Sequence, residues 1–238
     1  CPHHGPVDGP VRHPEDLARG DWEPRCPSCA TPVTPRPTDE TARRLPQSVY
    51  ALSKMDQEEL AVTVGRAYKF PVVALRYFNV YGPRQSLSNP YTGVAAIFSS
   101  CIKDGRPPLV YEDGQQTRDF VSVLDVVQAN LLALDREQAD YQVFNVGTGH
   151  AITIGELALL LAKLYGRDVQ PSFSGHYRSG DVRHCIADIS KIRGVLGYEP
   201  RVKLLDGLRE LVEWGIGVEA EDRVQRAAGE LLARGLAA

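Results

Sequence analysis

Ser48-Val-Tyr-Ala-Leu-Ser-Lys54 opens the stretch of sequence that decides the fold. Residues 49–68 have the apolar spacing of an amphipathic helix, with Pro46 just before it and Gly65 near its end. The apolar run Val72-Val-Ala-Leu75 that follows is typical of a buried strand. A helix followed at once by a buried strand predicts an α/β fold with parallel pairing.

The same alternation of short strands and helices continues along the chain. Helices are expected at residues 94–103, 125–134, 154–165, 189–196 and 204–219, and short strands at 109–111, 120–123 and 143–146. Thr153 and Glu156 have the spacing of a capping box. Residues 78–91, rich in Gly, Pro, Asn and Tyr, are expected to form a loop, and residues 222–238 a surface helix or a frayed tail.

The bulk composition limits the classes of protein that fit. The 238 residues are 43% hydrophobic, enough for one large domain or a domain plus a module. With 30 acidic against 27 basic residues the net charge is −3, which gives no electrostatic case for nucleic-acid binding. No apolar stretch is long enough to span a membrane. Because the chain begins at Cys1 rather than Met, we expect a fragment whose natural amino end is missing.

Three of the five cysteines crowd the first thirty residues. Cys1-x-x-His4 and Cys26-x-x-Cys29 make two ligand pairs, and four thiolate and imidazole donors are what a closed structural zinc site uses. His3 or His13 could replace His4, and the alternative is a disordered leader with chance cysteines.

The other two cysteines lie far from this cluster, at positions 101 and 185. Cys101 and Cys185 lie in apolar surroundings and are expected to be buried or inert. An odd count with this clustering argues against a disulfide framework and favours a reducing cytoplasm. The proline-rich run 31–37 is expected to be an extended linker.

Tyr50 and Lys54 lie one helical turn apart on the same face of the expected helix. A positive charge held beside a phenol favours its ionised form, so such a tyrosine can serve as a base towards a hydroxyl. The alternative is a surface tyrosine and a solvated lysine. Chemistry of this kind needs a nucleotide cofactor to take the hydride, yet no strand–Gly-x-Gly-x-x-Gly–helix unit precedes Tyr50. The run Gly147-Thr-Gly149 has Ile152 where that motif needs its third glycine, so we expect a turn there.

Six motifs follow one another between Pro46 and Trp214. They are Ser48-Val-Tyr-Ala-Leu-Ser-Lys54, Leu75-Arg-Tyr-Phe-Asn-Val-Tyr-Gly-Pro-Arg-Gln85, Glu112-Asp-Gly-Gln-Gln-Thr-Arg-Asp-Phe-Val-Ser-Val-Leu-Asp125, Phe144-Asn-Val-Gly-Thr-Gly149, Arg178-Ser-Gly-Asp181 and Leu196-Gly-Tyr-Glu-Pro200. In this order they resemble the extended short-chain dehydrogenase/reductase family, specifically its NAD-dependent sugar-nucleotide epimerases and dehydratases.

The resemblance implies a Rossmann-type α/β fold of which this chain is the later part. Residues 1–37 would then be a zinc-knuckle-like insertion and linker, residues 38–92 the remainder of the dinucleotide-binding domain, and residues 93–238 mainly the sugar-nucleotide-binding domain. It also implies an NAD site that is incomplete in this chain, and a homodimer formed through the Tyr-x-x-x-Lys helix.

The resemblance assigns roles to individual residues. Tyr50 becomes the catalytic acid/base towards a sugar hydroxyl, usually at C4, and Lys54 supports it and hydrogen-bonds the nicotinamide ribose. Phe78 lies by the nicotinamide and Asn79 hydrogen-bonds the substrate diphosphate, although Asn and Gly also suit a tight bend. The expected anion-binding group is Arg84, Arg118 and Arg178, with Asp181 contacting the nucleotide or ordering the arginine before it.

The family's catalytic serine or threonine is not found in this chain. Ser48 and Ser53 are too near Tyr50 in sequence and are expected to serve helix capping or packing. Thr38-Asp-Glu40 matches a dehydratase triplet but lies in a proline-rich stretch, so we expect a chance match.

These assignments lead to an expected activity. Epimerisation of a nucleotide-diphosphate sugar at C4 is expected ahead of 4,6-dehydration, because no acid pair for a dehydratase is evident. We expect the chain by itself to be inactive. The alternative is a non-catalytic binding protein that grips the sugar nucleotide and lacks the cofactor half.

Overall fold

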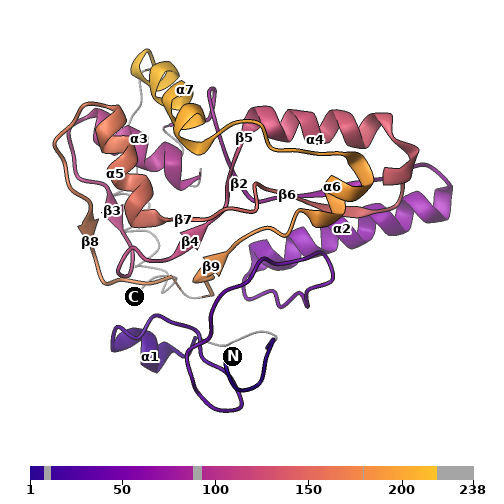
Figure 1. Cartoon of the computed structure of the whole chain (residues 1–238), viewed down its shortest axis with the longest axis horizontal. Helices are drawn as coiled ribbons and strands as arrows, with labels where there is room; N and C mark the ends of the chain where they lie inside the picture. Colours follow the sequence, from indigo (N-terminus) through magenta and orange to yellow (C-terminus); the bar gives the residue numbers. More distant parts are fainter. Residues whose placement is uncertain (8–11, 88–92, 179, 219–238) are drawn as a thin grey trace.

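The structure is a computed structural model that describes residues 1–7, 12–87, 93–178 and 180–218 (Figure 1). Its helices are α1 (Pro14–Ala18), α2 (Val49–Tyr68), α3 (Val94–Lys103), α4 (Val123–Asp135), α5 (Ile154–Leu164), α6 (Ser190–Leu196) and α7 (Leu204–Ile216), with a 3₁₀ turn at Glu137–Ala139. Its strands are β1 (Ala74–Tyr77), β2 (Asn79–Tyr81), β3 (Leu109–Val110), β4 (Thr117–Arg118), β5 (Phe120–Ser122), β6 (Val143–Val146), β7 (Ile152–Thr153), β8 (Ser172–Phe173) and β9 (His184–Cys185).

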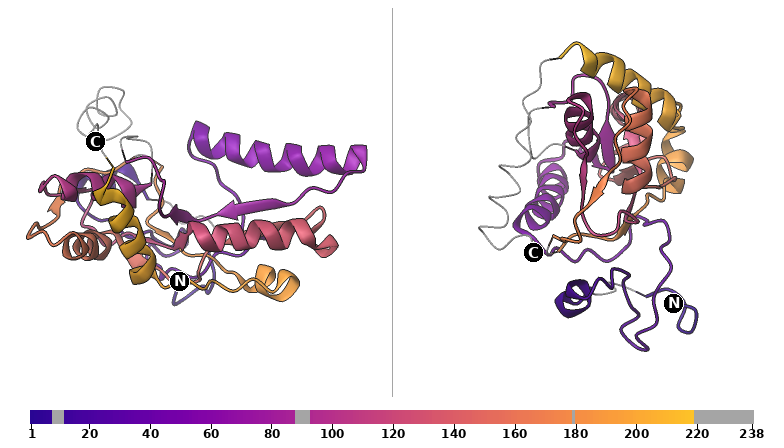
Figure 2. Two further views of the ribbon diagram at one scale, coloured as in Figure 1. Left: turned by 90° about the horizontal axis from the view of Figure 1, so that it is seen from above. Right: turned by 90° about the vertical axis from the view of Figure 1, so that its left-hand side faces the viewer.

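Parallel pairing dominates among the described strands. β1 pairs with β6, β2 with β5, β3 with β8 and β4 with β9, all in parallel, whereas β7 pairs with β4 antiparallel. Parallel neighbours need a crossover, and here the chain between paired strands contains helices. Both figures place α2 on one face of the β1–β6 pair and α4 on the other (Figures 1 and 2). The predicted α/β class with parallel pairing is therefore confirmed.

Helix α2 begins and ends as local chemistry dictates. The Ser48 hydroxyl caps it by accepting a hydrogen bond from the backbone N–H of Ala51 at 3.1 Å. It ends at Lys69 in the left-handed conformation (φ 59°). Gly65 is the one buried residue of the helix. It packs so closely against Val72 that a Cβ at position 65 would lie 2.5 Å from Val72 Cγ2. Helix and strand approach closely at that point, and most of α2 faces outward.

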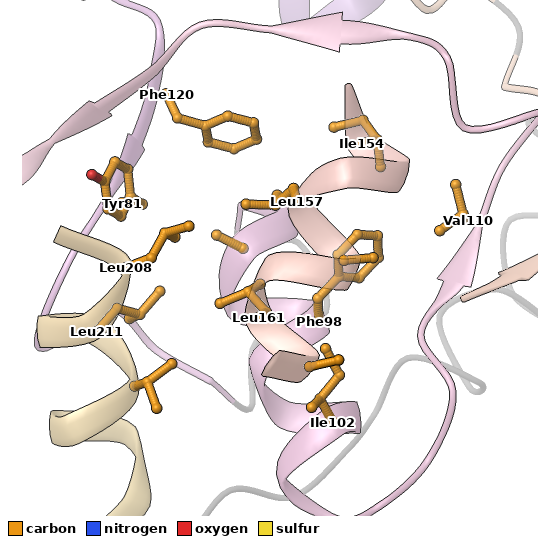
Figure 3. Packing of buried hydrophobic residues seen from close by; sticks show 14 residues of the cluster. Tyr81, Phe98, Ile102, Val110, Phe120, Ile154, Leu157, Leu161, Leu208 and Leu211 are labelled. Atoms are coloured by element: carbon orange, nitrogen blue, oxygen red, sulfur yellow. The ribbon is translucent and has the colours of Figure 1, made fainter. Parts of the chain in front are cut away.

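The larger hydrophobic core joins α3, α5 and α7 to the strands β2, β3 and β5. Phe98 and Ile102 from α3, Leu157 and Leu161 from α5, and Leu208 and Leu211 from α7 pack against Tyr81 of β2 and Phe120 of β5 (Figure 3). A second cluster lies around β6 and α6. Its fully buried members include Phe144, Ile192, Leu196 and Tyr198. The two clusters meet along the β2–β5 pair, since Val121 belongs to the second and Phe120 to the first.

Several expected elements are found, some of them with ends shifted by one to three residues. The helices expected at 94–103 and 49–68 and the strand at 143–146 have the expected bounds. The Thr153–Glu156 capping box is confirmed, with Thr153 Oγ1 accepting from the Glu156 N–H at 3.1 Å. The turn expected at Gly147–Gly149 is also found, with Gly149 in the left-handed region (φ 76°).

Two sequence predictions were wrong in detail. The strand expected at residues 72–75 is β1 at 74–77, because its hydrogen-bonded partner β6 begins opposite Ala74. The loop expected at residues 78–91 contains β2, since Asn79 pairs with Phe120 across the sheet despite being a turn-forming residue. In both cases a strand distant in sequence sets the bounds, and local composition does not.

The last expectations concern the end of the chain and membranes. The tail expected at residues 222–238, and the final residue of the helix expected to reach 219, lie outside the described residues. The last helix is described as Leu204–Ile216. Across the described ranges, none of the helices has the length and apolar character needed to cross a membrane. The division at residues 37 and 92 stays a prediction.

Candidate active site and Cys/His cluster

Tyr50 and Lys54 lie together on the exposed side of α2. The Lys54 ammonium nitrogen is 5.7 Å from the centre of the Tyr50 ring, and Tyr50 is 72% exposed. Ser53 Oγ donates to the Tyr50 carbonyl at 2.8 Å, so this serine serves the helix, as expected from the sequence. Lys54 Nζ also donates to Gln57 Oε1 at 3.1 Å. A phenol with an ammonium beside it and open access can exchange a proton with a bound hydroxyl.

A hollow of about 340 Å³ brings Tyr50 next to Phe78 and Asn79. Phe78 and Asn79 follow β1 directly, and the Phe78 N–H donates to the Val146 carbonyl at 3.0 Å. The carboxyl ends of β1 and β6 therefore open at this hollow, where α/β sheets bind ligands. The rest of the described lining comes from β2, β5, the residues around Gln85 and the start of α3: Val80, Gln85, Gly93, Val94, Ala95 and Phe120.

Arg118 and Asp181 form a second group. Arg118 Nη2 lies 3.2 Å from Asp181 Oδ1 and donates to the Val182 carbonyl at 2.7 Å, and Nη1 donates to the Arg183 carbonyl at 3.0 Å. Asp181 Oδ1 accepts from the Val182 N–H at 2.9 Å. The guanidinium thus ties β4 to the segment 181–183. Asp181 pairs here with Arg118, whereas the sequence led us to expect a contact with the nucleotide or with the preceding Arg178, and that role stays a prediction.

Arg178 lies on the same segment and is exposed. Its guanidinium carbon is 4.8 Å from the centre of the Tyr111 ring, a cation–π arrangement. A Cβ on Gly180 (φ 74°) would lie 3.1 Å from the carbonyl oxygen of Gln47, so the segment passes beside the start of α2. Arg84, in contrast, is exposed in the left-handed region (φ 70°) and does not line the described hollow.

Sequence reasoning missed a buried charged cluster next to this segment. Arg183, 2% exposed, pairs with Glu112 at 2.9 Å, Asp113 at 2.7 Å and Glu23 at 2.8 Å. Burial opposes its charge, but the hydrogen bonds with Asp113 and Glu23 outweigh burial and raise the pKa of Arg183. Nothing in the sequence marks this residue, because its partners come from two distant parts of the chain, Glu23 and the neighbours Glu112 and Asp113.

Cys1, His4, Cys26 and Cys29 converge at the front of the chain. Their four ligand atoms all lie within 4.8 Å of one another. Cys1 Sγ is 3.6 Å from Cys29 Sγ and 3.6 Å from His4 Nδ1, and Cys26 Sγ is 3.4 Å from the same nitrogen. His4, and neither His3 nor His13, joins this cluster in the described part of the chain. The Thr31 hydroxyl, 3.3 Å from Cys29 Sγ, and the Thr31 N–H lower the pKa of that thiol to about 6.

The remaining sequence candidates have structural roles. Thr38 bridges to Ala187, and Glu40 Oε1 accepts from the Asn145 N–H at 2.8 Å, so the Thr38-Asp-Glu40 triplet anchors the linker to the sheet. Cys101 is buried, and burial raises the pKa of the Cys185 thiol, which keeps it protonated.

This fold and site define a class of protein. The model of the NAD dependent epimerase/dehydratase family matches residues 27–147, just over half of the chain. The chain therefore belongs to this family of the extended short-chain dehydrogenases/reductases, which confirms the resemblance seen in the sequence.

Two of the relatives are named as 4-epimerases. A dTDP-L-rhamnose 4-epimerase of Burkholderia thailandensis is 38% identical over 217 residues, covering 87% of this chain and 57% of that protein. UDP-glucose 4-epimerase of Thermotoga maritima, solved with UDP-glucose, is 41% identical with a TM-score of 0.70 over 76% of this chain and 58% of its own.

A third relative was solved with the cofactor. The UDP-glucose 4-epimerase of Thermus thermophilus in complex with NAD is 31% identical, with a TM-score of 0.67 over 83% of this chain and 61% of its own. The chain thus spans little more than half the length of the relatives it matches.

Proposed function

We propose that this chain forms the acid/base and substrate-binding part of an NAD-dependent enzyme that epimerises a nucleotide-diphosphate sugar at C4. The observation that carries the proposal is the placement of Tyr50, with Lys54 beside it, at a hollow lined by Phe78 and Asn79. The names of three relatives, all 4-epimerases, support the reaction. Since the chain spans little more than half of each, the activity belongs to the protein that its complete reading frame encodes.

In this proposal Tyr50 accepts the proton of the sugar's C4 hydroxyl and later returns it. Lys54 would stabilise the phenolate that forms, and Lys54 and Phe78 would hold the nicotinamide end of NAD. NAD, when bound, supplies the hydride acceptor that turns the C4 alcohol into a ketone and back. The exposed Tyr50 side chain and the neighbouring hollow fit a nicotinamide ring, because Phe78 offers an apolar surface at the same hollow.

The diphosphate is held further along the same edge. Asn79 donates its amide to one phosphate, and Arg178, whose guanidinium lies exposed over the Tyr111 ring, donates to the other. Arg118 acts mainly by holding Asp181 and the carbonyls of residues 182 and 183. Arg84, exposed beyond β2, contributes a more distant positive charge.

Epimerisation fits this site better than 4,6-dehydration. A dehydratase needs an acid and a base beside C5 and C6 in addition to the tyrosine. No Asp or Glu is among the described residues that line the hollow. The carboxylate of Glu40, in the triplet that resembles a dehydratase motif, is already engaged with the backbone of Asn145.

The test is turnover by the protein expressed from its complete reading frame. Purified protein with NAD is incubated with UDP-glucose, UDP-glucuronic acid and dTDP-rhamnose in turn, and the C4 configuration of the product is read from proton NMR. We expect the C4 epimer of one of these sugars, with no loss of water. Tight binding of nucleotide sugars with no turnover of any would favour the alternative, a non-catalytic sugar-nucleotide-binding protein.

The Cys/His cluster fits one structural zinc ion. A tetrahedral zinc with bonds of about 2.3 Å to sulfur and about 2.0 Å to nitrogen separates two sulfurs by about 3.8 Å and a sulfur from a nitrogen by about 3.5 Å. The separations of 3.6 Å between Cys1 and Cys29 sulfurs, and of 3.4 and 3.6 Å from sulfurs to His4, agree with that geometry. The His3 N–H points to Cys1 Sγ at 3.4 Å, a backbone contact of the kind that supports a bound thiolate.

A homodimer through α2 completes the proposal. The helix has exposed apolar side chains along its length, with Val49 86%, Leu60 65% and Tyr68 76% exposed. Apolar side chains gathered on one helix favour burial against a partner. We assign that partner to a second copy, as in the resemblance to the family.

A further inference from the structure

The described part of the Cys/His segment, residues 1–7 and 12–37, contacts the chain at residues 176–178 and 180–184, which we call the clamp segment. Glu23 makes the central contact: its Oε1 accepts from Arg183 Nε at 2.8 Å, and its Oε2 lies 3.0 Å from His184 Nε2. Burial raises the pKa of Glu23, but the hydrogen bonds from His184 and Arg183 outweigh it and lower that pKa below its usual value. One carboxylate thereby holds two consecutive residues of the clamp segment.

Two further contacts hold the same segment. Arg12 Nη1 donates to the Asp181 carbonyl at 3.1 Å, and Nη2 pairs with Glu112, a residue 5% exposed. The rings of Trp22 and Tyr177 lie 6.3 Å apart. The Cys/His segment lies beneath β9 and β4 in Figure 1, which is the side on which these contacts are made.

The clamp segment also carries Arg178, one of the two proposed diphosphate ligands. It also carries Asp181, and a Cβ on Gly180 would lie 3.1 Å from the carbonyl oxygen of Gln47, two residues before α2. On one side the segment therefore touches the start of the helix that carries Tyr50, and on the other it is held by Glu23 and Arg12. A shift of the segment would move the anion-binding side chains relative to the hollow.

The Cys/His segment has little core of its own to fix Glu23. Its buried hydrophobic residues, among those described, are Leu17 and Cys26. Cys26 follows Glu23 by three positions, and its N–H donates to the Thr31 carbonyl at 2.9 Å, which closes the loop around Cys29. A segment with so small a core gains its order from a bound metal. The metal ligands are thus adjacent to the residues that hold the clamp segment.

The geometry points to Glu23 and Arg12 as positioning residues, through which the zinc-held Cys/His segment sets the affinity of the clamp segment for a nucleoside diphosphate. This inference rests on the proposed function for the identity of the ligand class and on the proposed zinc site for the order of the segment. Glu23 and Arg12 act through the clamp segment and need no contact with the nucleotide. Loss of either contact should weaken nucleotide binding and leave the chemistry at Tyr50 intact.

The experiment uses the protein from its complete reading frame and UDP and dTDP as probes, with the dissociation constant (Kd) measured by titration calorimetry. Glu23→Gln keeps the size of the side chain but removes its charge, and Glu15→Gln, at an exposed site on α1, is the matched control. We expect the Kd of the better-bound nucleotide to rise about tenfold in Glu23→Gln, the loss of about one charged hydrogen bond, and to stay unchanged in Glu15→Gln. Arg12→Gln should give a similar rise, and Glu23→Asp a smaller one.

The role of the metal is tested in the same proteins. Elemental analysis should find about one zinc per chain in the wild type and in Glu23→Gln, and none in a Cys26→Ser, Cys29→Ser double variant. The double variant should show the same rise in Kd despite an intact Glu23. Removal of zinc from the wild type with a chelator should raise Kd about tenfold, and added zinc should restore it.

The outcomes separate this inference from the proposed function. A nucleotide Kd that is unchanged in Glu23→Gln, or wild-type protein without zinc, overturns the inference. If the wild type binds UDP or dTDP with the expected dependence on Glu23 but epimerises no sugar, the proposed function fails and the inference stands. With an active enzyme, Glu23→Gln should raise KM about tenfold with kcat within about twofold, whereas a general loss of folding would lower kcat and the thermal midpoint together.

Discussion

The carboxylate of Asp119 collects backbone N–H groups from two distant parts of the chain. It accepts hydrogen bonds from Thr148 and Gly149 at 2.9 Å and from Ala187 at 3.2 Å, and the residue is 0% exposed. Asp119 lies between Arg118 and Phe120, so it joins the anion-binding edge to the turn that follows β6. A buried carboxylate of this kind is stable only because its oxygens are satisfied by donors.

Replacing Asp119 should therefore be costly. In Asp119→Ala the buried N–H groups lose their acceptor, and we expect the free energy of unfolding to fall by about 3–5 kcal/mol. Chemical denaturation of the purified protein measures the change. Asp168→Ala, at an exposed loop position, is the control and should change the free energy by less than about 0.5 kcal/mol. Equal losses in the two variants would mean that Asp119 has no special structural role.

At the residue scale the sequence predicted what lies in continuous motifs. Tyr50 and Lys54 are one helical turn apart, and Phe78 and Asn79 follow a strand. The spacing in the sequence was therefore enough to predict that the members of each pair lie together. Asp119 and Arg183 were missed, since their partners are remote in sequence and a lone charged residue reads as solvated surface. Whether the assigned residues perform the assigned chemistry stays a prediction.

At the scale of elements, one ion pair ties α2 to β1. Arg76 Nε donates to Glu58 Oε2 at 2.7 Å and Nη2 donates to Oε1 at 2.8 Å, a bidentate arrangement. Gly65 is the one buried residue of α2, so the helix has little buried surface of its own. The Arg76–Glu58 ion pair therefore helps to hold this helix, which carries Tyr50, against β1. The hydrogen bond from Arg76 is the largest cause that lowers the pKa of Glu58 below its usual 4.5.

The lowered pKa predicts a dependence of stability on pH. The contribution of a carboxylate with a lowered pKa is fully present above pH about 4.5 and is lost as the pH falls through its folded-state value. We expect Glu58→Gln to lower the free energy of unfolding by about 1 kcal/mol at pH 7 and by less as the pH approaches 3. Denaturation curves at several pH values measure this difference. Glu213→Gln, at an exposed position of α7, should show no such trend, and a pH-independent gap for Glu58→Gln would exclude the linkage.

Helices were easier to predict than strands for a physical reason. α2, α3 and α5 are long enough for their apolar spacing and caps to be legible in the sequence. Strands β4, β7, β8 and β9 have two residues each and exist only through pairing with one another or with β3. No local pattern marks a two-residue strand, because its stability comes entirely from the partner.

At the scale of the whole molecule, the exposed apolar face of α2 predicts self-association. We expect light scattering on the protein from its complete reading frame to give twice the mass of one chain. Leu60→Glu places a charge among the apolar side chains of α2 and should shift the protein to the mass of one chain at micromolar concentration. Leu134→Glu, at a position 81% exposed on α4, is the control and should stay dimeric. A monomeric wild type would show that the proposed dimer does not form.

The Cys/His segment overlaps the region that the chain shares with its relatives, since the family model matches from residue 27. The match to the rhamnose 4-epimerase covers more residues than the chain has after Pro46, so it includes part of the segment. The sequence predicted the four ligands from two short spacings, and the structure brings them together. The contacts of Glu23 with Arg183 and His184 were not predictable, because Glu23 lies in a stretch with no periodic pattern.

The most direct test of the central claim is the turnover of Tyr50→Phe in the protein from its complete reading frame. The substitution removes only the phenolic hydroxyl from a side chain that is 72% exposed, so the fold and the nucleotide contacts should persist. We expect kcat for C4 epimerisation to fall about 10²- to 10⁴-fold, with the Kd for UDP or dTDP within about twofold of the wild type. Retention of more than half of the wild-type kcat in Tyr50→Phe would contradict the account.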